Sequence, residues 1–147
     1  MQLTVHTDYA FRTLIALATI APELTTVGEL SERYDISANH LSKVVQRLSE
    51  LGYVETLRGK AGGVRLAAAP SSIRVGDVVR LMEPELGLVE CLRGGAPGAC
   101  VISPACRLKS VLTTALDSFL HVLDGYTLAD LVKNRGRVEK LLELRVP

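Results

Sequence analysis

The chain has 147 residues, of which 48% are hydrophobic, and a formal net charge of +1. This length allows one domain with a proper core, and the near-zero charge gives no support for nucleic-acid binding through overall charge. No apolar run approaches the ~18 residues that a membrane span needs, and the N-terminus lacks the features of a signal peptide. We therefore expect a cytoplasmic protein without a membrane partner, whose three cysteines stay reduced.

The first helix is predicted over residues 7–21, because apolar residues recur there at the spacing of one helix face. Asp8 falls in its first turn, where the helix dipole favours a carboxylate. From the residues alone, that stabilising role is the simplest interpretation of Asp8.

A helix-turn-helix pattern follows. Thr26 and Glu29 have the spacing of a capping box, which predicts a short helix that ends near residue 34. After a three-residue turn, Ser37 is the expected N-cap of a helix over residues 38–51 that has one apolar and one polar face. The polar face could hydrogen-bond to base edges in the major groove of DNA. The candidate contacts are Ser37, Asn39, His40, Ser42 and Lys43.

A β-hairpin is predicted next, because two β-prone runs, YVETL and VRLA, flank the glycine-rich basic turn RGKAGG. A hairpin directly after a candidate recognition helix is the wing of a winged helix. Residues 56–72 contain no acid, which fits a local phosphate-binding face, although a solvated basic turn is the alternative. The candidate contacts to phosphate or the minor groove are Arg58, Lys60, Gly62, Gly63 and Arg65.

The rest of the chain is predicted to hold a connecting helix over residues 75–82, a cysteine loop, and a long helix over residues 105–123. The apolar band of the long helix is too wide for one core contact, so we interpret it as a dimerisation helix. The predicted fold is mainly α with a small β-hairpin: a winged helix-turn-helix head plus a long dimerisation helix. The expected divisions are the head at 1–70, the connecting helix and cysteine loop at 71–104, and the dimerisation and C-terminal helices at 105–147.

The cysteine loop contains Cys91, Cys100 and Cys106, spaced C-x8-C-x5-C, with glycine and proline between them. Three thiols in one irregular loop suggest a shared ligand, and we favour a metal or iron–sulfur site. The spacing lacks the close ligand pair of a zinc finger and the patterns of ferredoxins. Structural or redox-sensing thiols are the main alternative, and a catalytic cysteine is disfavoured because the histidines are scattered among helices.

Six segments in this order span nearly the whole chain: MQLTVHTDYAFRTLI, SANHLSKVVQRLSELGYV, RGKAGGVRL, IRVGDVVRLMEP, SPACRLKSVL and SFLHVLDGYTLADLV. Together they resemble the NsrR family of nitric-oxide-sensing repressors, which is related to the cluster regulator IscR. The resemblance implies a homodimeric winged-helix repressor, not an enzyme, that binds double-stranded operator DNA and holds one 4Fe–4S cluster per subunit.

The same resemblance implies roles for particular residues. Cys91, Cys100 and Cys106 match the three thiolate ligands of the family. Asp8 matches the position from which the partner's first helix supplies a fourth ligand, and Arg12 matches a position on that helix that couples the cluster to DNA binding. IscR has a histidine three residues after its last cysteine; Lys109 stands there in this chain, which argues against an IscR-type 2Fe–2S site.

The implied mechanism is a tie between subunits. The intact cluster would join the cysteine loop of one subunit to the first helix of the other and so fix the separation of the recognition helices, which must match half-sites roughly 34–36 Å apart. Nitric oxide would break this tie, lift repression and allow expression of genes for its detoxification. The alternatives are a winged-helix regulator that senses iron or redox state, an iron–sulfur scaffold that does not bind DNA, and an apo-protein thiol switch.

Overall fold

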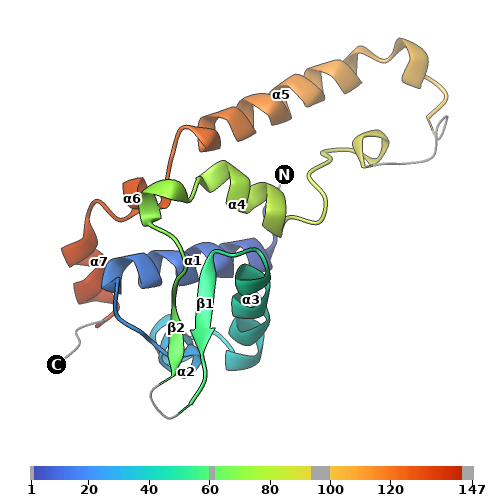
Figure 1. The fold of residues 1–147 in the computed structure, drawn as a ribbon. Helices are drawn as coiled ribbons and strands as arrows, with labels where there is room; N and C mark the ends of the chain where they lie inside the picture. The colour runs from blue at the N-terminus through green and yellow to red at the C-terminus, as the bar shows by residue number, and fades with distance from the viewer. Residues whose placement is uncertain (1, 60–61, 94–99, 144–147) are drawn as a thin grey trace.

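Helix α1 (Val5–Ile20) lies at the centre of the fold, with nine of its 16 residues buried. The computed structural model describes residues 2–59, 62–93 and 100–143, and Figure 1 shows the other elements of the head packed around α1. Leu14 and Leu17 are fully buried in the main core with Ala10. The helix begins two residues earlier than predicted because Thr4, its N-cap, accepts a hydrogen bond from the Thr7 backbone N–H.

The helix-turn-helix is formed by α2 (Val27–Tyr34) and α3 (Ala38–Glu50). The capping box of Thr26 and Glu29 is present with both of its hydrogen bonds, as predicted. Asp35 adopts a left-handed conformation between the two helices, which lets the chain turn sharply. Ser37 occupies the N-cap position of α3 as predicted, but its side chain makes no capping hydrogen bond.

The predicted wing is an antiparallel pair of strands, β1 (Val54–Leu57) and β2 (Gly63–Leu66). Val54 and Val64 turn into the core, while the remaining strand side chains stay partly or fully exposed. A bridge between Thr25 and Val64 joins the hairpin to the segment before α2. The wing is therefore fixed to the head at its base.

Helix α4 (Val75–Met82) follows a short 3-10 turn, η1 (Pro70–Ser72), and buries Val78, Val79 and Met82. Two more 3-10 turns, η2 (Glu90–Leu92) and η3 (Ser103–Ala105), lie in the cysteine segment. The C-terminal part holds α5 (Arg107–Asp124), α6 (Leu128–Leu131) and α7 (Arg135–Leu141). Helix α7 packs back against α1. The fold class is as predicted: mainly helical, with a two-stranded hairpin.

Helix α5 projects beside the head and buries only Leu120 among its 18 residues (Figure 1). Leu108, Val111 and Val122 are each 60% exposed. Among the residues that the structure describes, no helix is long and apolar enough to cross a membrane.

Candidate functional site

The candidate recognition helix presents every predicted polar contact to solvent. Ser37, Asn39, His40, Ser42 and Lys43 are all exposed. They can be exposed together because the opposite face of α3 is anchored by Leu41, Val44, Val45 and Leu48, all buried. The Ser42 hydroxyl donates to the Ala38 carbonyl at 2.8 Å, so it retains only acceptor capacity for a further partner.

The described part of the wing carries less unpaired positive charge than we predicted from the sequence. Arg58 is exposed, and Lys60 lies outside the described residues. Arg65 Nε donates to Glu55 Oε1 at 2.5 Å, in an ion pair across the hairpin. Glu55 lies one residue before the acid-free segment 56–72 on which the prediction of a basic face was based. The prediction therefore did not include its neutralisation of the Arg65 charge.

Gly62 and Gly63 have a structural reason to be glycine that is independent of DNA. A Cβ on Gly63 would lie 2.7 Å from the Thr25 carbonyl oxygen, at the bridge that joins the wing to the head. A Cβ on Gly62 would overlap the Leu57 carbonyl oxygen. Both positions require glycine for the hairpin to close, and their proximity to a phosphate strand stays a prediction.

A basic hollow of about 620 Å³ borders the recognition helix between the start of α1 and the end of α4. Its lining includes His6, Lys43, Arg47 and Arg80. Arg47 was not among the predicted site residues, although it lies four residues after Lys43 and one helical turn along the same side of α3. That spacing was the signal that could have identified it.

Asp8 and Arg12 form an ion pair on the exposed side of α1. Arg12 Nη2 lies 2.7 Å from Asp8 Oδ2, and the two side chains are 44% and 49% exposed. The hydrogen bond to Asp8 raises the pKa of Arg12. The Tyr34 hydroxyl donates to the Arg12 carbonyl at 2.9 Å, and burial raises the pKa of Tyr34 to about 12. Tyr34 thus joins α2 to the middle of α1.

The three cysteines are free thiols. Cys91 and Cys106 are partly exposed and Cys100 is exposed. Reduced, accessible thiols are the ligand type that iron–sulfur clusters require, so the donor chemistry fits such a cluster. In the described ranges no group of three or more His, Cys, Asp or Glu side chains is placed to hold a metal ion. The subunit alone does not bring the predicted ligands together.

The placement of the cysteine segment explains why Asp8 does not lie near the cysteines of its own chain. Figure 1 shows η2 and η3 near the N-terminal end of α5, where the segment projects from the head, whereas Asp8 lies on α1 within the head. Asp8 and the cysteines of one chain are therefore on different parts of the molecule.

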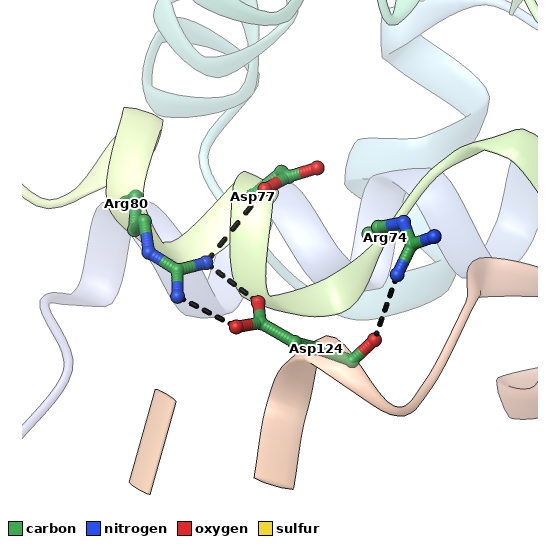
Figure 2. Close-up of polar contacts among 4 residues, drawn as sticks. All are labelled: Arg74, Asp77, Arg80 and Asp124. Atoms are coloured by element: carbon green, nitrogen blue, oxygen red, sulfur yellow. Dashed lines mark hydrogen bonds and ion pairs between the residues drawn. The ribbon is translucent and has the colours of Figure 1, made fainter. Parts of the chain in front are cut away.

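The junction between α4 and α5 is held by a cluster of charged side chains (Figure 2). Arg80 binds Asp124 in a bidentate pair, Nη1 to Oδ1 at 2.6 Å and Nη2 to Oδ2 at 2.7 Å. Arg74 Nη1 donates to the Asp124 carbonyl at 3.3 Å, and Asp77 lies 3.7 Å from Arg80. The hydrogen bonds from Arg80 lower the pKa of Asp124. Asp124 thus holds the C-terminal end of α5 to the head.

A helix-turn-helix with an exposed polar recognition helix, followed by a hairpin wing, defines a winged-helix DNA-binding regulator. Residues 3–134 match the Rrf2 model, described as "Iron-dependent Transcriptional regulator". The chain belongs to the Rrf2 family of transcriptional regulators.

Relatives and solved structures agree with this assignment. The chain is 51% identical over 146 residues to the HTH-type transcriptional regulator NsrR of Bacillus subtilis and 47% identical over 146 residues to that of Geobacillus kaustophilus; each match covers 99% of both chains. The fold resembles T. potens IscR (TM-score 0.70, 27% identity, 91% of this chain and 88% of that one). It also resembles the oxidised form of Staphylococcus aureus CymR (TM-score 0.71, 26% identity, 90% and 97%). The two NsrR relatives and the matched family are described as transcriptional regulators, which agrees with the prediction that this chain is a regulator and not an enzyme.

Proposed function

We propose that this chain is a homodimeric repressor of transcription in the cytoplasm. It binds double-stranded operator DNA while each subunit holds a 4Fe–4S cluster, and it releases the DNA after nitric oxide reacts with the cluster, so that genes for nitric oxide detoxification are expressed. The similarity to NsrR relatives over nearly the full chain supports this choice within the Rrf2 family.

The DNA-binding part of the proposal rests on α3 and the wing. Asn39, His40 and Lys43 project from the exposed face of α3, where they would meet base edges and flanking phosphates in the major groove. Arg58 would contact phosphate or the minor groove from the wing, and Lys60 is proposed beside it from its place in the sequence. Arg65 would contribute less, because Glu55 offsets its charge.

The dimer rests on the exposed apolar positions of α5. Leu108, Val111, Ala115 and Val122 recur at spacings of three, four and seven, which places them along one side of the helix. A second copy of α5 packed along this side would remove the apolar positions from water, which is the favourable direction for such side chains.

The observation that carries the proposal is the similarity over nearly the full chain to relatives named NsrR. Cys91, Cys100 and Cys106 would hold the cluster from one chain, and the partner subunit's Asp8 would complete the ligand set across the dimer. The bound cluster supplies an iron centre that reacts with nitric oxide. Arg12 holds only Oδ2 of its own Asp8 at 2.7 Å, so Oδ1 is the oxygen available to a new partner.

Anaerobic purification tests the proposal. We expect a brown dimer with a 4Fe–4S absorption spectrum that binds its operator and loses that affinity on titration with nitric oxide. Cys106→Ala should abolish cluster assembly, Asp8→Ala should alter the spectrum and the nitric oxide response, and Glu23→Ala, an exposed acid elsewhere, should change neither. An Asp8→Ala protein identical to wild type would remove the proposed ligand role of Asp8.

A regulator that senses iron supply or redox state through the same cluster is the second candidate, and the description of the matched family as iron-dependent favours it. The same preparation distinguishes the two. Loss of DNA binding on iron depletion, with no change on stoichiometric nitric oxide, would support the iron sensor. A colourless protein that binds DNA only after thiol oxidation would instead support a thiol switch.

A further inference from the structure

We propose that Glu83, at the end of α4, is a positioning residue that transmits the state of the cysteine segment to the first turn of α1 and to the recognition helix. This inference rests on the proposed function, because it assigns the route by which a change at the cysteines would reach the DNA-binding surface.

Glu83 is a buried acid, 8% exposed, and its side chain accepts hydrogen bonds from Thr4, which lies 79 residues earlier in the chain. Its Oε1 accepts hydrogen bonds from the Thr4 backbone N–H at 2.7 Å and from the Thr4 hydroxyl at 3.1 Å. Thr4 is itself the N-cap of α1 and accepts from the Thr7 backbone N–H at 3.3 Å. Glu83 therefore fixes the cap of the helix turn that carries Asp8, where the helix dipole also favours a negative charge.

The same turn of α4 contacts two further elements. The Leu81 carbonyl accepts from Arg47 Nη2 of the recognition helix at 3.3 Å. Arg80 holds Asp124 at the base of α5. Residues 80–83 thus join α1, α3 and α5 at one place. A displacement of this turn would act on the candidate ligand helix, the recognition helix and the dimerisation helix together.

The chain between Glu83 and Cys91 is short, and a hydrogen bond and close packing hold its turn in place. Arg93 Nε donates to the Gly87 carbonyl at 2.8 Å, which closes residues 87–93 into a turn that contains Cys91. A Cβ on Gly87 would lie 2.6 Å from the Arg93 side chain and 2.7 Å from the Leu92 backbone, so this turn is tightly packed. Only residues 84–86 separate the turn from Glu83, and Pro84 restricts the backbone at the first of them.

These contacts would differ between the state in which the cysteines are tied to the partner subunit and the state in which they are not. If the cysteines are tied to a second subunit, the braced turn holds Glu83 against Thr4; once the tie is lost, the turn and Glu83 are free to shift together. A signal can bias the DNA-binding equilibrium only through contacts that differ between the states, and the bonds from Glu83 to Thr4 are such contacts.

The experiment compares the dissociation constants of cluster-loaded and cluster-free dimers for one DNA duplex selected by the wild-type protein. The ratio of the two constants measures coupling. We expect Glu83→Ala to lower this ratio at least about fivefold, within the range of allosteric coupling, while cluster content stays at the wild-type level. Glu83→Gln, which keeps the shape and one acceptor oxygen, should lower the ratio less. Glu85→Gln, an exposed acid two residues further on, is the matched control and should retain the wild-type ratio.

Amide hydrogen exchange of the cluster-free protein provides a second readout. Exchange in residues 5–8 should be faster in Glu83→Ala than in Glu85→Gln, because the cap of α1 has lost its partner. If Glu83→Ala does not fold, the ratio of dissociation constants measured for Glu83→Gln decides whether Glu83 couples the two sites.

Equal loss of affinity in both states, with an unchanged ratio, would show a merely structural role and overturn the inference. Loss of the cluster in Glu83→Gln would also overturn it. A wild-type ratio of one would instead refute the proposed function itself.

Discussion

Individual side chains in this protein act across long sequence distances. Three side chains make hydrogen bonds from one helix or its end to another. Tyr34 bonds to the backbone of α1, Glu83 to the N-cap of α1, and Arg80 to the end of α5. Apolar packing is not directional and by itself would allow the packed helices to slide past one another. Each of these three hydrogen bonds restricts that sliding, because a hydrogen bond requires a particular geometry.

The first prediction concerns Tyr34 at alkaline pH. Burial raises its pKa from 10.0 to about 12, so between these values the folded protein keeps a proton that the unfolded chain loses. This contribution to stability is complete below pH 10 and is lost as the pH rises toward 12. In urea unfolding from pH 9 to 12, Tyr34→Phe should show a smaller alkaline loss of stability than wild type. Tyr126→Phe, at an exposed position, is the control, and equal losses in all three proteins would contradict the assignment.

The second prediction uses two glycines, each the second residue of its helix. A Cβ on Gly76 would overlap Asp124 Oδ1 and displace the pair with Arg80, whereas a Cβ on Gly136 meets nothing within 4 Å. Gly76→Ala should lower the free energy of unfolding by about 1–3 kcal/mol through overpacking. Gly136→Ala should raise it by up to about 1 kcal/mol through helix propensity. Chemical denaturation measures both, and the opposite signs exclude a general effect of alanine.

At the scale of elements, local patterns predicted most of the head. The capping box at Thr26 and the apolar face of α3 are set by residues three or four apart, so the sequence displays them directly. The ion pair between Arg65 and Glu55 requires the strand register, and the contact of Glu83 with Thr4 requires the tertiary fold. The pair of Asp124 with Arg80 likewise requires the tertiary fold, because periodicity identifies a helix face without its partner.

The wing gives the third prediction. Arg58 is exposed, whereas Arg65 is paired with Glu55 at 2.5 Å. If Arg58 contacts phosphate, Arg58→Ala should weaken binding to all DNA sequences alike. It should also reduce the slope of log affinity against log salt by about 0.9 per wing, the value for one released counterion. Fluorescence anisotropy at several salt concentrations measures this slope.

Arg65→Ala is the comparison for the wing, since its positive charge is already offset within the hairpin. A smaller change in slope is expected for this variant. An unchanged slope in Arg58→Ala would count against the wing as a DNA contact.

At the scale of the whole molecule, the head and α5 differ in how they are stabilised. The head has a continuous core from Ala10 on α1 to Leu128 on α6, whereas α5 buries only Leu120.

The fourth prediction tests the dimer. Val111 is 60% exposed on α5, and Val111→Asp would place a charge within the proposed interface. The variant should remain folded in the head and sediment as a monomer at concentrations where wild type is dimeric. Thr113→Asp, at an exposed position on the opposite side of the helix, is the control and should remain a dimer. Analytical ultracentrifugation distinguishes the two, and a dimeric Val111→Asp would refute this interface.

The attachment of α5 at one end has a mechanical consequence. Asp124, at its C-terminal end, is held by Arg80, and the helix extends from there for 18 residues, or about 27 Å. A rotation of about 10° at this base would move the N-terminal tip, next to Cys106, by about 5 Å, because displacement grows with distance from the pivot. The geometry is that of a lever arm. A small change of angle at the salt bridge corresponds to a shift of several ångströms at the thiols, and a constraint of a few tenths of an ångström at the thiols would fix the angle at the head to within about a degree.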